Sequence, residues 1–476
     1  MDAARRPRLI RFSIALVAEI LLCASLNFFD DWTLEEMPVK FVAFAMLCGV
    51  AYLVAVSSFP PQISPRIQGG IFWAVVIGLR LVALPLEPGD DFWRYQWEGK
   101  IQHAGFNPYV NAPDDPRLEP IRAEFPAWPK INHRDFRAIY PPGIELLFAG
   151  LSGISDNPLL YKLLFAGADI ATIAVLLRLF SVAAVYDRRP VSGASPNGIA
   201  DSQSAASRYA NAAWYAWNPL VVYGFAGGAH FDSLMILPMV AGILFLTRFE
   251  TATDSRRKWW LALAASAAFG IAISMKLIPV FLLLCCVFAL GYRAITLVVS
   301  GAIPLLLSLL YGYPKVPIWD SLRSFTYVTR VNDLFWWLIE ETIWPNPHQK
   351  NYHYNVILLI AVAVVSLLAW WNWKRAMLWV LGTALVLSPV LHPWYCPWIL
   401  PLATWRRAFA WHVLSITLFA YFLFWNERLF VLPWHAEPWL RAIIIVPPLI
   451  AAIYIGLTQR TQGSLAGRDP SSEIRD

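Results

Sequence analysis

The chain has 476 residues, of which 58% are hydrophobic and 15% are charged, and its net charge is +6. A soluble domain carries about 25% charged residues, so this composition and a mean hydropathy of +0.50 exclude an ordinary soluble fold and predict an integral membrane protein. Nucleic acid is not an expected partner, because the basic residues sort by loop and form no stripe with interleaved aromatic rings.

The chain opens with "MDAARRPRLIRF", which runs into an apolar stretch without a small-residue cleavage site. This pattern predicts a first membrane helix, not a signal peptide that is removed. All five cysteines fall in or beside apolar runs and show no metal-ligand spacing, which indicates small packing residues. They are Cys23, Cys48, Cys285, Cys286 and Cys396.

Apolar runs of membrane-spanning length recur along the whole chain, since a spanning helix needs about 20 mostly apolar residues. They predict an all-α polytopic membrane protein, a single domain over 1–476 with 12–14 transmembrane helices. We place spans at 9–27, 38–57, 70–86, 158–184, 208–225, 231–248, 259–275, 277–292, 294–312, 354–373, 376–391, 394–404, 408–425 and 440–458, of which 394–404 is short.

The loop charges predict the orientation, because Lys and Arg in short loops stay in the cytoplasm. With both termini and the tail 459–476 inside, the basic loops alternate without contradiction. The long segment 87–157, the loop 313–353 and the loop 426–438 then share the non-cytoplasmic face. The stretch 189–207 is predicted to be a flexible polar linker. A bacterial inner membrane is the expected location.

The segment "PGDDFWRYQWEGKIQHAGFNPY" (88–109) is the most polar stretch beside a span. Pro88 and Gly89 end the third span, Asp90 fits a helix N-cap, and a helical period runs from Asp91 to about Ala104. It predicts an amphipathic outer helix at the membrane interface, with rings toward the membrane and acids toward water. One side holds Asp91, Tyr95, Glu98 and Gln102, and the other holds Trp93, Trp97, Ile101 and Ala104.

The two adjacent acids leave two interpretations open. An Asp at an N-cap with another in the first turn is ordinary helix-end chemistry. A helix N-terminus also keeps a carboxylate ionised, which suits a general base, and two carboxylates at a water boundary could hold a divalent cation. The residues alone do not decide between these interpretations, nor whether a metal cofactor is needed.

The acidic segment, followed by "IYPPGIELLFAG", resembles the first outer loop of GT-C glycosyltransferases, which use polyprenyl-phosphate sugars. The nearest group is the bacterial mannosyltransferases around glycosyltransferase family 87. Four later stretches fit the same pattern: "WNPLVVYGFAGGAHFDSLMILPMV" (217–240), "ISMKLIPVFLL" (273–283), "YVTRVNDLFWWL" (327–338) and "SPVLHPWYCPWILPL" (388–402). The chain departs from many relatives, which have one span before the acidic loop, in having additional spans within residues 1–60.

This resemblance implies a GT-C-like bundle and a catalytic role for the acid pair. Asp90 would be the general base, with Asp91 orienting it or sharing a cation, and Glu98 is the next candidate for the base. The implied substrate-binding residues are Arg94, Glu98, Tyr140, His230, Asp232, Lys276, Arg330, Asn332 and His392. Bases of this kind contribute roughly 10²–10⁴-fold to the rate.

Several of these residues also have a structural alternative. Tyr140 precedes a helix, 141–153, that is expected to pack on the outer surface without spanning, and its prolines suit a helix start. Asp232 could cap a helix. Lys276 at a span end could snorkel to water or neutralise the phosphate of the leaving group. Arg330 could fork onto phosphate oxygens.

The resemblance therefore implies a membrane glycosyltransferase, inverting at the anomeric carbon, with mannose as the expected sugar. Its expected partners are a polyprenyl-phosphate sugar donor, a lipid or glycan acceptor, and membrane lipids. The alternative is a transporter or flippase of lipid-linked sugars, but such proteins tend to show repeated halves, and none is visible. A membrane scaffold would not need acids, Lys, Arg and His gathered at one face.

Overall fold

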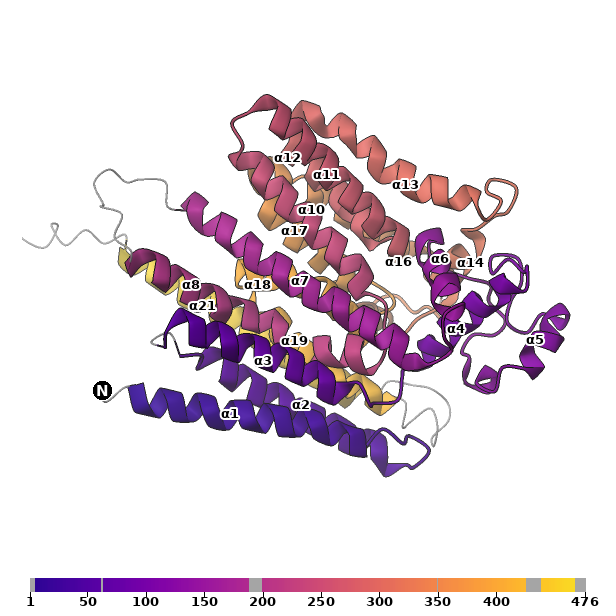
Figure 1. Ribbon diagram of the computed structural model, residues 1–476, viewed down its shortest axis with the longest axis horizontal. Coiled ribbons are helices and arrows are strands. Elements are labelled where there is room, and N and C mark those ends of the chain that lie inside the picture. Colours follow the sequence, from indigo (N-terminus) through magenta and orange to yellow (C-terminus); the bar gives the residue numbers. More distant parts are fainter. Residues whose placement is uncertain (1–4, 61–62, 188–198, 349, 425–437, 467–476) are drawn as a thin grey trace, which may run out of the picture.

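The computed structural model describes residues 5–60, 63–187, 199–348, 350–424 and 438–466. Over these residues the secondary structure is helical, apart from one parallel bridge between Val331 and Val390. Most long helices run roughly side by side in one bundle (Figure 1), and eight described helices are long and apolar enough to cross a membrane. The prediction of an all-α polytopic membrane protein is confirmed.

The first half of the chain forms long helices separated by short ones. The elements are α1 (Arg5–Ser25), α2 (Glu36–Ser57), α3 (Pro65–Ala83), α4 (Asp90–His103), α5 (Glu119–Ala123), α6 (Pro142–Ser152), α7 (Pro158–Asp187), α8 (Ile199–Ala216), α9 (Pro219–Val222), the π-helix η4 (Tyr223–Gly227) and α10 (Ser233–Thr251).

The second half continues the bundle and returns twice to its polar end. Its elements are α11 (Ser255–Met275), η5 (Ile278–Leu282), α12 (Leu283–Leu290), η6 (Gly291–Leu297), α13 (Val298–Leu309), α14 (Asp320–Val328), α15 (Trp336–Thr342), α16 (Tyr352–Ser366), α17 (Ala369–Val386), η7 (Pro393–Trp398), α18 (Leu400–Arg406), α19 (Phe409–Thr417), η8 (Leu418–Phe422) and α21 (Pro438–Ala466).

Several predicted spans take the form of interrupted helices. The predicted span 208–225 is broken at Asn218 and Pro219, where α8 gives way to α9. The predicted spans 277–292 and 294–312 form one apolar segment, Ile278–Leu309, which Gly291 divides with a φ of 58°. Three further apolar helices are shorter than a span: Pro142–Ser152, Tyr352–Ser366 and Phe409–Phe422.

The linker prediction needs correction. Residues 199–207 belong to α8 and are helical, where a flexible polar linker was expected over 189–207. The sequence there includes three alanines, and alanine has the highest helix propensity. The remainder of that linker up to residue 198 lies outside the described residues, as do 426–437 of the predicted outer loop and 467–476 of the tail.

The two longest polar segments pack together at one end of the bundle, where α4, α5, α6 and α14 lie (Figure 1). The side-chain amide of Asn107 donates to the carbonyl oxygen of Tyr311 at 2.9 Å, and the Ser321 hydroxyl donates to that of Arg137 at 2.9 Å. Segments 87–157 and 313–353 therefore share one end of the bundle. The side of the membrane that this end faces stays a prediction.

We predicted that α4 lies in the membrane surface with one face toward the lipid. The structure differs from this prediction. Both of its sides are covered by protein. Trp97 and Ile101 are buried against Leu118, Phe125 and Ile131 of the same polar segment. The opposite side packs on α6, where the ring of Tyr95 stacks on Phe148 at 4.7 Å. The amphipathic pattern of the sequence did not reveal that Leu118, Phe125 and Ile131 fold back over Trp97.

An ion pair within the bundle joins three helices that carry the polar end. Arg80 of α3 lies 2.5 Å from Asp169 of α7, and the Tyr215 hydroxyl of α8 donates to Asp169 at 2.9 Å. All three side chains are buried. A buried charge pair needs such additional hydrogen bonds to offset desolvation, so this cluster is expected to fix how α3, α7 and α8 pack.

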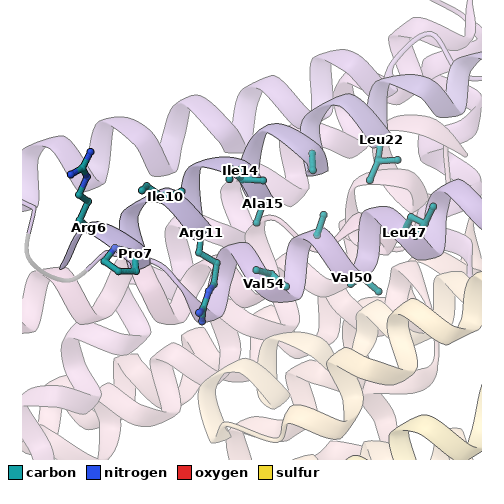
Figure 2. A pocket seen from close by; sticks show the side chains of 12 residues that line it. Arg6, Pro7, Ile10, Arg11, Ile14, Ala15, Leu22, Leu47, Val50 and Val54 are labelled. Atoms are coloured by element: carbon teal, nitrogen blue, oxygen red, sulfur yellow. The ribbon is translucent and has the colours of Figure 1, made fainter. Parts of the chain in front are cut away.

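A groove of about 1210 Å³ lies between α1 and α2 (Figure 2). Apolar side chains such as Ile14, Leu47 and Val50 line it, with Arg6 and Arg11 toward the N-terminal end of α1. That end of α1 points away from α4 (Figure 1). An apolar lining of this kind suits lipid chains and contains no acid, so the reactive groups must be sought elsewhere.

Candidate active site

The acid pair stands at the start of α4, held by backbone contacts. Gly89 is the N-cap residue in an extended conformation, and its N–H donates to the carbonyl oxygen of Gly228 at 3.0 Å. The prediction that Asp90 is the N-cap is therefore wrong by one residue, since the chain enters the helix one position earlier. Asp90 instead accepts the Asp91 backbone N–H on Oδ1 at 3.1 Å.

Asn132 connects the two carboxylates. Its amide nitrogen donates to Oδ1 of Asp91 at 2.7 Å and to Oδ2 of Asp90 at 3.1 Å. The Asp91 side chain is 21% exposed. Burial, and next the charge of Asp90, raise the pKa of Asp91 to about 7. The Asp91 carboxyl therefore gains and loses its proton near neutral pH, which is the range in which a general base works best.

A divalent cation was one expectation for this pair. Over the described residues, no three His, Cys, Asp or Glu side chains gather as a metal site. The two carboxylates are bridged by the amide of Asn132 instead. The donor set that these residues offer is thus two acids and an amide.

A cavity of about 450 Å³ opens beside the acids, and it collects residues from all of the stretches that the sequence singled out except 217–240. Asp90, Asp91 and Arg94 come from α4, and distant parts of the chain supply the others: Tyr140, Lys276, Arg330 and His392. Lys and Arg side chains are the usual partners of phosphate and carboxylate groups. We refer to this space as the cationic cavity.

Lys276 follows the last residue of α11 and does not extend into solvent. Its ammonium lies 2.5 Å from Oδ1 of Asp232 and 4.7–5.0 Å from the ring centres of Phe231, Tyr395 and Trp398. The side chain is 15% exposed. The geometry gives a fixed cation on the cavity wall, which differs from the free snorkelling of a lysine at a span end.

The Asp232 side chain bonds to Lys276 and does not cap α10. It is the N-cap residue of α10 but makes no capping hydrogen bond with its side chain. Its Oδ1 accepts from the Trp398 indole at 2.6 Å as well as from Lys276. Asp232 is fully buried and does not line the cationic cavity, so its contact with a substrate would be through Lys276.

Arg330 lines the cavity but is shared between two acids. Its Nε lies 3.1 Å from Asp333, and its Nη1 is paired with Glu340. Asn332, with a φ of 51°, donates to the carbonyl oxygen of Leu391 at 3.0 Å and does not line the cavity. That bond holds the 327–338 stretch beside His392, so Asn332 acts on the shape of the wall.

His392 and His230 stack on the same indole, that of Trp394. The ring centres are 4.5 Å apart for His392 and 3.8 Å apart for His230. His392 Nδ1 is 2.9 Å from the Tyr421 hydroxyl. Burial lowers the pKa of His392 to about 3, and burial followed by the charge of Lys276 lowers that of His230 well below its usual range. Both rings are neutral at physiological pH.

Arg94 and Glu98 form a support under the site. Arg94 Nε lies 2.8 Å from Glu98, and its other nitrogens donate to the carbonyl oxygens of His133, Phe136 and Arg137 at 2.6–2.9 Å. Both side chains are buried. Arg94 thus anchors the chain on either side of the cavity wall, and Glu98 does not line the cavity.

Tyr140 lies on the cavity wall just before α6. Its ring meets those of Tyr95 and Phe231 edge to face at 5.7 and 5.1 Å. The helix that follows has 11 residues and is largely buried against α4 and α11. At about 1.5 Å per residue it is too short to cross a bilayer, in agreement with the expectation of a non-spanning helix.

Two features of the site carried no signal that sequence reasoning found. Asn132 lies in "KINHRDF", where no spacing marks it, although it bonds to both acids. The loop Asp30–Thr33 lines a second cavity of about 670 Å³, which shares Asp90 and Trp394 with the cationic cavity. Asp30 and Asp31 are adjacent acids between two predicted spans, and this pattern alone did not assign them to the site.

The fold and site together define a polytopic membrane protein with an acid pair beside two cavities at one end of a helical bundle. Residues 38–292 match the family model described as "Alpha-(1->6)-mannopyranosyltransferase, N-terminal domain". The match covers more than half of the chain, and the chain belongs to this MptA_B family of mannosyltransferases. Neither a curated protein nor a solved structure was found to match the chain.

Proposed function

We propose that the protein transfers a mannosyl residue from a polyprenyl-phosphate donor to the 6-hydroxyl of a lipid or glycan acceptor, on the non-cytoplasmic face of the membrane. The observation that carries the proposal is the position of Asp90, which lines both cavities. A base there can take a proton from a hydroxyl in one cavity while the other holds the sugar phosphate.

The reaction is a single displacement. The acceptor oxygen bonds to C1 of the donor sugar, the bond from C1 to the phosphate oxygen breaks, and its electron pair leaves with the polyprenyl phosphate. The hydroxyl proton passes to Asp90, with Asp91 and Asn132 holding that carboxylate in place. Inversion with an α product requires a β-linked donor.

The cations of the cationic cavity support placing the donor phosphate there. Negative charge grows on the phosphate as the bond breaks, and a fixed cation stabilises that charge. Lys276 is held by Asp232 and three rings, so little reorganisation is needed. Arg330 is already paired with two acids, which makes Lys276 the principal phosphate contact and Arg330 the secondary one.

Transfer by the purified protein in liposomes tests the proposal. The donor is radiolabelled β-mannosyl phosphoryl polyprenol, the acceptor is octyl α-mannoside, and an α-(1→6)-specific mannosidase identifies the product. We expect labelled disaccharide that this mannosidase cleaves. Movement of donor across the bilayer without any disaccharide would favour a flippase and contradict the proposal.

Lys276→Ala refines the test. We expect the KM for the donor to rise by about tenfold or more, because a hydrogen bond to a charged partner is lost, while the KM for the acceptor changes less. Arg330→Ala should also raise the KM for the donor, but by less than Lys276→Ala. Equal losses toward both substrates would indicate that Lys276 has only a structural role.

A further inference from the structure

The second cavity differs in chemistry from the cationic one. Four acids lie on its walls, Asp30 and Asp31 from the loop between α1 and α2, and Glu87 and Asp90 from the segment before and in α4. The one Lys or Arg among its lining residues, Lys130, is paired with Glu87 at 2.8 Å and lies 4.5 Å from the ring centre of Trp93. A phosphate would be repelled here, whereas the hydroxyls of a neutral sugar can donate to carboxylates.

His230 is an unused polar group on the wall of this cavity. Its side chain is 1% exposed, and neither ring nitrogen has a hydrogen-bond partner. The nearest carboxylate, that of Asp91, lies 3.9 Å away. A buried polar group without a partner is costly, and a neutral imidazole can donate one hydrogen bond and accept another. A sugar hydroxyl in the cavity would supply the missing partner.

Aromatic rings complete a sugar-binding surface. Trp32, Trp93 and Trp394 line the cavity. A pyranose ring presents C–H faces to such rings and hydroxyl edges to acids. The volume of about 670 Å³ lies within the range of ligand pockets, roughly 300–1,000 Å³.

The loop that supplies Asp30 and Asp31 is attached to the catalytic segment. The Glu87 backbone N–H donates to Asp30 at 3.1 Å, three residues before Asp90. The Asp31 carboxylate accepts from the Thr33 hydroxyl at 2.6 Å. This loop connects α1 to α2 and precedes the residues 38–292 that match the family model.

We propose that this acidic cavity binds the terminal pyranose of the acceptor, with its 6-hydroxyl toward Asp90, and that the loop Asp30–Thr33 determines which acceptor is used. The proposal rests on the proposed function. His230 and the loop carboxylates then hold the acceptor ring, Trp394 separates it from the donor, and the reacting oxygen meets C1 at the junction of the two cavities.

Steady-state kinetics with octyl α-mannoside and β-mannosyl phosphoryl polyprenol test the proposal, using the full-length protein and Asp31→Asn. Asp31 is exposed, so the variant should fold. We expect the KM for octyl α-mannoside to rise about tenfold, with the KM for the donor unchanged. Glu35→Gln, an exposed acid of the same loop that does not line the cavity, should match the parent protein.

His230→Gln supplies a second variant at the buried end of the cavity, and it should also raise the KM for the acceptor selectively. An unchanged acceptor KM in both variants, or a rise in the donor KM instead, would overturn the proposal while leaving mannosyl transfer itself intact. A parent protein that transfers no mannose would overturn the proposed function, and the acceptor site with it.

Discussion

The backbone N–H of Gly89 donates to the carbonyl oxygen of Gly228 at 3.0 Å. This bond joins the residue before the acid pair to the turn that presents His230, although the two are distant in the sequence. A Cβ atom built on Gly89 would lie 3.2 Å from Nε2 of His230 and 3.4 Å from the Gly228 oxygen. The close approach explains why glycine suits this position.

We therefore predict that Gly89→Ala lowers transfer by roughly tenfold or more, because the added methyl group displaces the His230 ring or the start of α4. Gly150→Ala in α6 is the control, since its Cβ would meet nothing within 4 Å. Transfer assays and melting temperatures of both variants check this. Equal activities for the two variants would show that the approach of Gly89 to His230 is not required.

Arg94→Lys is predicted to loosen the cavity wall. Lysine keeps the charge beside Glu98 but cannot reach the carbonyl oxygens of His133, Phe136 and Arg137 together. Backbone amides between 131 and 139 should exchange hydrogen faster, and kcat should fall. Arg122→Lys, in the same outer segment, should leave that exchange unchanged, and similar exchange rates in parent and Arg94→Lys would contradict the anchoring role.

Asp91→Asn is predicted to stabilise the protein at alkaline pH. Because the pKa of Asp91 is raised to about 7 from about 3.9 in an unfolded chain, the native state binds more protons than the unfolded state between these values. The free energy of unfolding of the parent therefore falls as the pH rises through that window. The melting temperature of Asp91→Asn should exceed that of the parent by more at pH 8 than at pH 5.

Asp115→Asn is the control for this pH dependence. Hydrogen bonds from Arg117, and next from Asn111, hold the pKa of Asp115 below its usual range. Its contribution is then complete above about pH 5, so the difference from the parent should be the same at pH 5 and pH 8. A pH-independent difference for Asp91→Asn as well would mean that the pKa of the Asp91 carboxyl is not raised.

Within the bundle, Arg80→Met is predicted to destabilise the protein by about 3–5 kcal/mol, because it leaves Asp169 buried without its cation. Arg80→Met combined with Asp169→Leu should recover most of that loss. Thermal unfolding in detergent measures both variants. If the losses of stability caused by the two substitutions simply add, the ion pair is not what couples α3 to α7.

Much of the fold could be predicted from the sequence because hydropathy and helix breakers act locally. The start of α4 follows from Pro88 and Gly89, and the predicted and observed limits of α2, α10 and α11 agree within a few residues. The burial of Trp97 by Leu118 and Phe125 could not be predicted, because it depends on a loop folding back over the helix.

For the site, the residues that sequence reasoning found are those in motifs with a family resemblance. Asp90, Lys276 and His392 do line one cavity. The hydrogen-bond partners of these residues could not be predicted from the sequence. Asp232 bonds to Lys276 instead of capping a helix, and Asn132 bonds to both acids although no local sequence pattern indicates this. Such contacts arise from tertiary structure, which spacing in one sequence does not encode.

The most direct test of the central claim is the transfer rate of Asp90→Asn with β-mannosyl phosphoryl polyprenol and octyl α-mannoside, measured beside Asp91→Asn. Asparagine keeps the size of the side chain and can accept one of the two hydrogen bonds of Asp90 on its amide oxygen, while it removes the base. We predict that turnover falls by about 10²-fold or more, with the melting temperature and donor binding preserved, and that Asp91→Asn loses less. Transfer by Asp90→Asn at near the parent rate would contradict the assignment of Asp90 as the base.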